Sequence, residues 1–421
     1  MNTHRTPLKA ARLTSSTLAI LALGLLAASS LAGRSSALSP HLAPSALVTN
    51  STASTNTNKG GFKPLVPKIS VIPGEPPAHE ETAASEVATS TQSPEVGGAV
   101  TPVQSAAPAI SETAPFRFFS STSFWNKPLA ANAPIDPNSA SVVTAFDNEI
   151  KAVEQAGDGP WINTTAYSIP IYTVPKSQPT VPVELQHKMP EPALSAAWSA
   201  VPLPADAKPA AGTDGILVVS QPSTNRLWEF WRLVHGINGW HASWGGAMQS
   251  VSSGAGVFGP GVWPESKEWW GASASSLSLV GGLISIEDLK LGQINHALAV
   301  GIPNARAGVY ASPAHRSDGK STSANSLPEG AQLRLNPTLD LATLHLPRLT
   351  LMIAEAAQRY GIFITDTAAA PTFYAQDPTT TGNDAYIGSA GYFEGKRPNQ
   401  LLESFPWDRL ELVKAELHDV K

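Results

Sequence analysis

Aromatic residues are distributed very unevenly along this chain. The first 115 residues contain a single aromatic residue, Phe62, whereas all eleven tryptophans lie at or after Trp125. Between residues 33 and 115 the composition is dominated by Ser, Thr, Ala and Pro, which cannot bury enough apolar surface to offset the entropy of ordering a chain. We therefore expect 33–115 to be a disordered tether and 116–421 to be a single globular domain.

The N-terminus has the pattern of a secretion signal. Arg5, Lys9 and Arg12 precede an apolar core from Leu18 to Leu26, and small residues follow at Ser30-Leu31-Ala32. This order of basic, apolar and small residues predicts a signal peptide that ends at the last of them. We expect a protein that is secreted or held at the cell surface; an uncleaved N-terminal anchor is the alternative.

Charge and motif content exclude several classes of function. The net charge is only −5 and no run of Lys or Arg occurs, so a nucleic-acid partner is not expected. The absence of cysteine excludes thiolate metal sites, a cysteine nucleophile and disulfides. No metal-binding spacing of histidines or acidic residues occurs, and neither a metal nor a cofactor is predicted. The Gly-x-Ser-x-Gly motif of serine hydrolases is also missing.

The folded part is predicted to be mainly β. Strand-like segments follow one another at 216–220, 227–234, 240–244, 296–302, 308–312, 332–335, 362–365 and 372–376. A helical stripe runs from Leu349 to Tyr360, between Pro347 and Gly361. Because strands outnumber helices, we expect an antiparallel β-sandwich or barrel, jelly-roll-like, with helices at its margins.

The segment Arg226–Leu233 suggests a catalytic carboxylate. Period-two alternation places Glu229 on one strand face between Leu227 and Trp231. Such surroundings disfavour the charged form and raise the pKa towards that of a general acid. The alternative is that Glu229 forms an ion pair at the sheet surface, with Arg232 or another cation.

Clustered tryptophans suggest a carbohydrate ligand. Trp231, Trp240 and Trp244 lie close together in sequence, near glycine-rich segments, and indole faces can stack on sugar rings. Arg232 is a further candidate for substrate binding. The alternative is that these tryptophans simply fill a β-core.

Two aspartates could complete a hydrolytic site. Asp366 ends the strand Ile362–Thr365, and Asp214 lies in a Gly-containing turn just before a strand. Glycoside hydrolysis needs two carboxyl groups, and Glu229 with Asp366 or Asp214 would supply them. Asp318 also lies beside glycine and is interpreted as a turn residue.

A second mechanism uses a histidine. His296 opens a predicted strand and could abstract a proton, with Tyr310 and with Arg316 or Arg334 to neutralise a substrate carboxylate. These are the groups that a polysaccharide lyase needs. The alternative is a structural histidine.

Several motifs resemble a group of uncharacterised exported proteins of soil bacteria. They are Phe119-Ser120 with 123–128 (Ser-Phe-Trp-Asn-Lys-Pro), 228–232 (Trp-Glu-Phe-Trp-Arg), 296–298 (His-Ala-Leu) and 360–362 (Tyr-Gly-Ile). The resemblance covers nearly the whole folded part. It implies one coherent domain in an exported bacterial protein, and it transfers no catalytic residue.

The sequence therefore predicts a secreted glycoside hydrolase that acts on an extracellular polysaccharide. A polysaccharide lyase using His296, and a non-catalytic module that binds a polysaccharide or cell wall, are the alternatives. Apart from the possible anchor, no membrane contact is expected.

Overall fold

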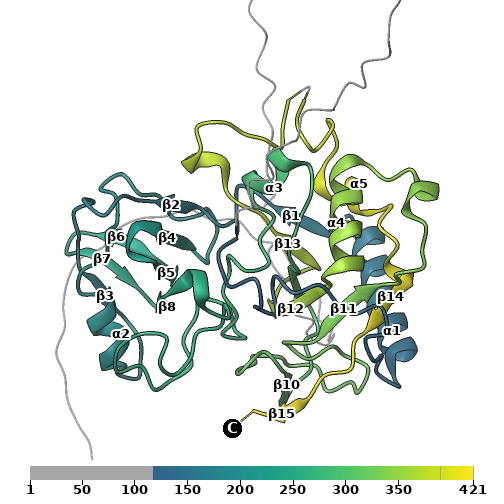
Figure 1. The fold of residues 1–421 in the computed structure, drawn as a ribbon, viewed down its shortest axis with the longest axis horizontal. Coiled ribbons are helices and arrows are strands. Elements are labelled where there is room, and N and C mark those ends of the chain that lie inside the picture. The colour runs from purple at the N-terminus through teal and green to yellow at the C-terminus, as the bar shows by residue number, and fades with distance from the viewer. Residues whose placement is uncertain (1–116, 389, 421) are drawn as a thin grey trace, which may run out of the picture. The chain divides into compact units, whose positions relative to one another are not determined.

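The computed structural model describes residues 117–388 and 390–420 (Figure 1). The predicted signal peptide, 1–32, and the predicted tether, 33–115, lie outside these residues. All described residues belong to one compact unit, Pro102–Lys421. None of the helices in this described part combines the length and apolar character needed to cross a membrane.

Helices form a minor part of the described chain. The α-helices are α1 (Ser139–Ala156), α2 (Pro192–Ala197), α3 (Ile286–Leu291), α4 (Arg348–Arg359) and α5 (Pro398–Leu402). Single 3₁₀ turns lie at Pro222–Thr224, Val251–Ser253, Leu341–Leu344, Pro378–Thr380 and Trp407–Arg409. The predicted helix from Leu349 to Tyr360 is confirmed as α4, which Pro347 precedes and Gly361 follows.

The largest sheet has six strands and is mixed. Its strands, in spatial order, are β1 (Trp161–Asn163), β13 (Thr372–Tyr374), β9 (Leu298–Ile302), β12 (Ile362–Thr367), β11 (Gln332–Leu335) and β14 (Leu410–Leu412). Two pairs are parallel, β1 with β13 and β9 with β12, and the other neighbours are antiparallel. Helices α1, α4 and α5 contact strands of this sheet (Figure 1).

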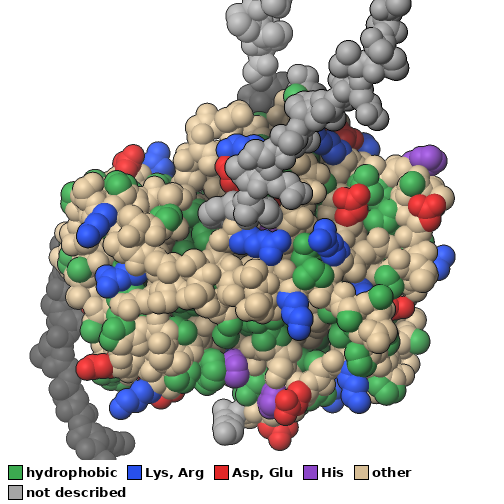
Figure 2. Space-filling model, in the orientation of Figure 1, with side chains coloured by type: hydrophobic (Ala, Val, Ile, Leu, Met, Phe, Trp, Pro, Cys, Tyr) green, Lys and Arg blue, Asp and Glu red, His purple; other side chains and the backbone are tan. Residues whose placement is uncertain are grey.

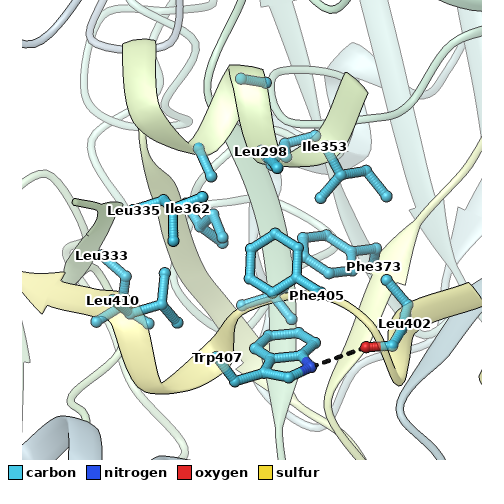
Figure 3. Packing of buried hydrophobic residues seen from close by; sticks show 14 of the residues in the cluster. Leu298, Leu333, Leu335, Ile353, Ile362, Phe373, Leu402, Phe405, Trp407 and Leu410 are labelled. Atoms are coloured by element: carbon cyan, nitrogen blue, oxygen red, sulfur yellow. Dashed lines mark hydrogen bonds between the residues drawn. The ribbon is translucent and has the colours of Figure 1, made fainter. Parts of the chain in front are cut away.

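An apolar core joins this sheet to its helices. Leu298 of β9, Ile362 of β12 and Ile353 of α4 are almost completely buried in it. Figure 3 shows Phe373, Phe405 and Trp407 packed together in the same core, with the Trp407 indole donating to the Leu402 carbonyl at 3.1 Å. Each such side chain contributes about 1.5–3 kcal/mol by leaving water.

The remaining strands form three smaller sheets. A four-stranded sheet contains β2 (Ile171–Thr173), β4 (Leu217–Gln221), β5 (Arg226–Trp231) and β8 (Trp244–Gln249). A three-stranded sheet contains β3 (Val183–Leu185), β7 (Gly239–Ala242) and β6 (Val234–Gly236). A two-stranded sheet pairs β10 (Val309–Ala311) with β15 (Leu417–Asp419).

The predicted strand 227–234 is divided in the structure. Its first part, β5, pairs with β8, and only its last residue, Val234, belongs to β6, which pairs with β7 in a tight hairpin. The break falls at Arg232, whose φ of 55° is left-handed and incompatible with a continuous strand. Arg232 therefore directs the chain from the four-stranded sheet to the three-stranded one.

A second apolar core lies around the four-stranded and three-stranded sheets, and most of its tryptophans are buried. Trp125, Trp198, Trp228 and Trp270 are 0–2% exposed. Trp240 is also buried, 9% exposed, with its ring beside His235. The core-filling alternative therefore holds for Trp240, and the structure removes it from the predicted stacking platform.

The predicted fold class is confirmed at its coarser level: the described chain is β-rich with few helices. Its strands form four separate sheets and close no barrel within the described residues. The largest sheet is mixed and not purely antiparallel. Pairing β9 directly with β12 in parallel requires a long crossover, which β11 and α4 occupy. The sandwich is not confirmed.

Candidate active site

A pocket of about 520 Å³ brings together five of the ten predicted site residues. This volume is within the range of small-ligand sites, roughly 300–1,000 Å³. Its lining comes from the four-stranded sheet, from β12 and β13 of the six-stranded sheet, and from the loops at 272–279 and 316–318. Of the predicted residues, the lining includes Asp214, Trp231, Trp244, Arg316 and Asp366.

Two tryptophans form an aromatic wall of this pocket. Trp231 of β5 and Trp244 of β8 are direct partners in the antiparallel register, and both are half-buried. Direct partners in such a pair point to the same sheet face, so the two indoles lie side by side. Arg232 lies over the Trp231 ring, with its guanidinium carbon 4.2 Å from the ring centroid, although Arg232 does not line the pocket.

Asp214 is fixed to the end of β5. Its backbone carbonyl accepts from the Arg232 amide at 2.7 Å, and its Oδ1 accepts from the Trp231 indole at 3.2 Å. The Trp231 carbonyl accepts from the Ser243 amide on the β8 side, so the Arg232 amide of the same peptide points to the opposite side, towards Asp214. The end of β5 thus holds both an acid and an aromatic wall residue.

Three carboxyl groups converge on the β12 part of the pocket. Oxygens of Asp318, Glu329 and Asp366 lie within 4.8 Å of one another. We call these three residues the carboxyl cluster. A register shift between Ile364 and Asp366 marks a bulge in β12, and bulges commonly redirect a side chain near a functional site.

Asp366 is the carboxyl group of the cluster with a pKa near neutrality. It is half-buried, and its oxygens accept from the amides of Ala274 at 3.2 Å and Thr367 at 2.9 Å. Burial raises the pKa of Asp366 to about 7, the negative charge of Asp318 adds to the increase, and the two amides oppose it. Asp366 can therefore hold a proton at neutral pH and still release it.

Glu329 lies behind the other two carboxyl groups and is completely buried. Its Oε2 accepts from the Asp318 amide at 3.3 Å, whereas its Oε1 has no hydrogen-bond partner. Burial raises the pKa of Glu329 to about 9, and the charges of Asp366 and Asp318 raise it further in the same direction. Glu329 is thus a protonated acid at neutral pH.

Arg316 supplies a cation beside the cluster. Its Nε donates to the Ser276 hydroxyl at 2.7 Å, and its Nη2 lies 2.8 Å from the Ser273 carbonyl and within 3.3 Å of two further carbonyls. Burial lowers the pKa of Arg316 to about 10, although the nearby cluster carboxylates oppose that change. These contacts hold the loop that lines the pocket.

Glu229 lies outside the pocket lining. It is fully buried on β5, where its Oε1 accepts from the Ser278 hydroxyl at 2.5 Å and from the Leu279 amide at 3.0 Å. Burial raises the pKa of Glu229 to about 7, against the effect of these hydrogen bonds. The predicted rise in pKa agrees with the structure. The carboxyl group, however, binds the loop around Ser278 and Leu279 and does not line the pocket.

The residues of the predicted lyase are dispersed. The ring nitrogens of His296 contact Asp288 Oδ2 at 3.2 Å and the Ala297 carbonyl at 2.8 Å, beside a cavity of only about 20 Å³. Tyr310 of β10 stacks on His418, with ring centroids 5.3 Å apart. Arg334 pairs with Glu411 at 2.7 Å. Within the described residues, only Arg316 of that set lines the pocket, so the structural alternative fits His296.

The sequence did not predict some residues of the pocket and of its carboxyl cluster. Glu329 lies in Leu327-Pro328-Glu329-Gly330, where Pro and Gly suggest a turn, and Asp318 was interpreted as a turn former. Tyr374 of β13 also lines the pocket, and burial raises its pKa well above the usual value. No periodic pattern marks these residues, because the sheet order brings them together from separate segments.

The carboxyl cluster is also the part of the pocket that could hold a cation. Carboxylate oxygens at such separations suit hard cations such as Ca²⁺ or Mg²⁺. Two of the three carboxyl groups would first have to lose protons, because their pKa values are about 7 and about 9. Proton storage and cation binding are therefore alternative states of the same three residues.

No known family model, characterised protein sequence or solved structure matches this chain. The resemblance to exported soil-bacterial proteins therefore stays a prediction, and the function must be argued from the pocket itself.

Proposed function

We propose that this protein is an exported glycoside hydrolase that cleaves an extracellular polysaccharide in the pocket between Trp231 and Asp366. One observation carries the proposal: a carboxyl group with a pKa of about 7 faces a pocket that also contains a second aspartate and two partly exposed indoles. Glycoside hydrolysis needs this combination of a protonated acid, a second carboxylate and a surface that holds a sugar ring.

Asp366 serves as the proton donor. It gives its proton to the glycosidic oxygen while the bond between that oxygen and the anomeric carbon breaks. The neighbouring charge of Asp318 disfavours early loss of the proton and is the second cause of the raised pKa of Asp366. Asp214, held by the Trp231 indole, either takes a proton from the attacking water or attacks the anomeric carbon itself.

Trp231 and Trp244 position the substrate. Their half-buried indoles can stack on the apolar face of a sugar ring while the carboxyl groups act at its edge. The scaffold supports this geometry because the four-stranded and three-stranded sheets share one apolar core. Sandwich-like packing of these two sheets is part of the proposal.

The surface carries charged side chains of both signs. Figure 2 shows Lys, Arg, Asp and Glu side chains interspersed over one face, with wide uncharged areas between them. Such a surface offers no continuous basic track of the kind that nucleic-acid binding uses.

The full chain should be incubated with plant, fungal and bacterial-wall polysaccharides, with reducing ends and the absorbance of unsaturated sugar ends followed together. We expect new reducing ends without that absorbance, and a loss of about 10²–10⁴-fold in Asp366→Asn. Asp206→Asn is the matched control, since Asp206 is exposed and lies outside the pocket. Silence with every polymer, or full activity of Asp366→Asn, would overturn the proposal; retention on one polymer without cleavage would indicate a binding module.

A further inference from the structure

We propose that the pocket selects a sugar bearing a protonated amino group, as in a polymer of unacetylated glucosamine. This inference rests on the proposed function, because it names the substrate class of the same site. Its basis is the charge and the aromatic character of the pocket wall.

Acidic groups outnumber basic ones along the wall. The described lining contains the carboxyl groups of Asp214, Asp318 and Asp366, and Arg316 is its one Lys or Arg side chain. The acids come from both parts of the pocket: Asp214 is tied to β5, and the other two belong to the carboxyl cluster. A ligand in the pocket is therefore close to negative charge on more than one side, which attracts a cation.

Arg316 does little to attract an anionic sugar. Its Nε and Nη2 are already engaged by the Ser276 hydroxyl and by backbone carbonyls. Its positive charge also lies next to the carboxyl cluster, whose members are its charged neighbours. A uronic acid would gain little from this arginine and would meet repulsion from the aspartates.

A buried acceptor in the cluster lacks a partner. Glu329 is completely buried, and its Oε1 has no hydrogen bond although it lies among acidic neighbours. An unpaired buried acceptor costs roughly 1–3 kcal/mol. An ammonium group has three donors and no acceptor, so it can donate to the Asp318 carboxyl group, which lines the pocket beside Glu329.

The indoles of the aromatic wall already contact cations of the protein itself. The guanidinium carbon of Arg232 lies 4.2 Å from the Trp231 ring centroid, and that of Arg316 lies 5.8 Å from the Trp244 centroid. Both indoles thus already lie within reach of a positive charge, as expected from the negative face of the ring. An amino sugar could stack its ring on these indoles and direct its ammonium group towards the carboxylates.

The test compares two matched oligosaccharides. Asp366→Asn in the full chain is titrated by calorimetry with the hexamer of glucosamine and with the hexamer of N-acetylglucosamine, in mildly acidic buffer that keeps the amines protonated. We expect at least tenfold tighter binding of the amine hexamer, about 1.4 kcal/mol, with the preference decreasing as salt increases. Adding Asp318→Asn should remove most of the preference, because Asp318 is the cluster carboxylate that remains in the pocket lining, whereas adding Asp206→Asn should leave it unchanged.

Three results would overturn the inference. One is equal or tighter binding of the N-acetylated hexamer. Another is retention of the preference after Asp318→Asn. The third uses the unmodified protein: tryptophan-sensitised terbium luminescence that the amine hexamer fails to displace would show that the cation of this site is a metal.

The inference and the proposed hydrolase can fail separately. Cleavage of an uncharged or acidic polymer, without binding of the amine hexamer, would overturn the amino-sugar inference and keep the hydrolase. Binding of the amine hexamer without cleavage of any polymer would keep the inference and contradict the hydrolase.

Discussion

Glu229 on β5 and Asp366 on β12 share a pKa of about 7 but occupy two very different regions. Glu229 is enclosed behind the loop at 272–279, where its Oε1 accepts two hydrogen bonds from that loop. Asp366 lines the pocket, beside two other carboxyl groups. Burial is the largest cause of both raised pKa values, so the pKa alone does not distinguish a structural acid from a catalytic one. Access to a ligand distinguishes the two acids, because Asp366 lines the pocket and Glu229 does not.

The largest expected effect concerns the second carboxylate. Asp214→Asn should reduce the rate of polysaccharide cleavage by about 10²–10⁴-fold, because the base or nucleophile is lost while the fold is kept. Initial rates of reducing-end formation check this, with Asp206→Asn as the control. An Asp214→Asn rate within tenfold of the unmodified protein would remove Asp214 from the mechanism.

A pair of tryptophans sharpens the contrast between core and pocket. Trp228→Ala should lower the free energy of unfolding by about 3–5 kcal/mol, because Trp228 is 2% exposed and its indole donates to the Ala197 carbonyl. Trp231→Ala, three residues further along β5, should cost much less stability and instead weaken substrate binding. Denaturant unfolding and KM measurements separate the two. Equal losses of stability would contradict the assignment of Trp231 to the pocket wall.

Glu229→Ala tests the structural role of the enclosed acid. Truncation leaves the Ser278 hydroxyl and the Leu279 amide without their partner, so the free energy of unfolding should fall by about 1–3 kcal/mol. The change is read from the midpoint of denaturant unfolding. An unchanged free energy of unfolding would mean that the Glu229 hydrogen bonds do not stabilise the loop around Ser278 and Leu279.

Glu329→Gln tests the proton held in the cluster. The folded-state pKa of Glu329 is about 9, above the ordinary value of 4.5, so its contribution to stability is complete below pH 4.5 and is lost as the pH rises towards 9. Gln does not titrate. Relative to the unmodified protein, Glu329→Gln should therefore gain about 1 kcal/mol or more in unfolding free energy between pH 5 and pH 9. If the difference in unfolding free energy between the two proteins stayed constant from pH 5 to pH 9, Glu329 would be ionised in the folded protein over that range.

Local patterns in the sequence predicted the parts of this molecule that depend on neighbours along the chain. The helical stripe ending at Tyr360 became α4, and Asp366 at the end of its strand lines the pocket. Period two also placed Glu229 and Trp231 on one side of a strand, but only Trp231 lines the pocket, because Ser278 and Leu279 lie against the Glu229 carboxyl group. A contact with a distant loop of this kind has no periodic signal.

Contacts between distant segments could not be predicted in the same way. Glu329 reaches the cluster because β12 lies between β9 and β11, an order that follows from long-range strand pairing. Trp240 and Trp244 are four residues apart and equally aromatic, yet one is buried in the core and the other lines the pocket. Burial of that kind depends on which sheet each strand joins.

The most direct test of the account compares Glu229→Gln with Asp366→Asn on the same polysaccharide under the same conditions. Both substitutions replace a titrating carboxyl group by an amide of nearly the same size. The account predicts that Glu229→Gln, corrected for its folded fraction, cleaves within a few-fold of the unmodified protein, and that Asp366→Asn loses about 10²–10⁴-fold. An inactive Glu229→Gln beside an active Asp366→Asn would contradict it and would place the chemistry behind the loop at 272–279.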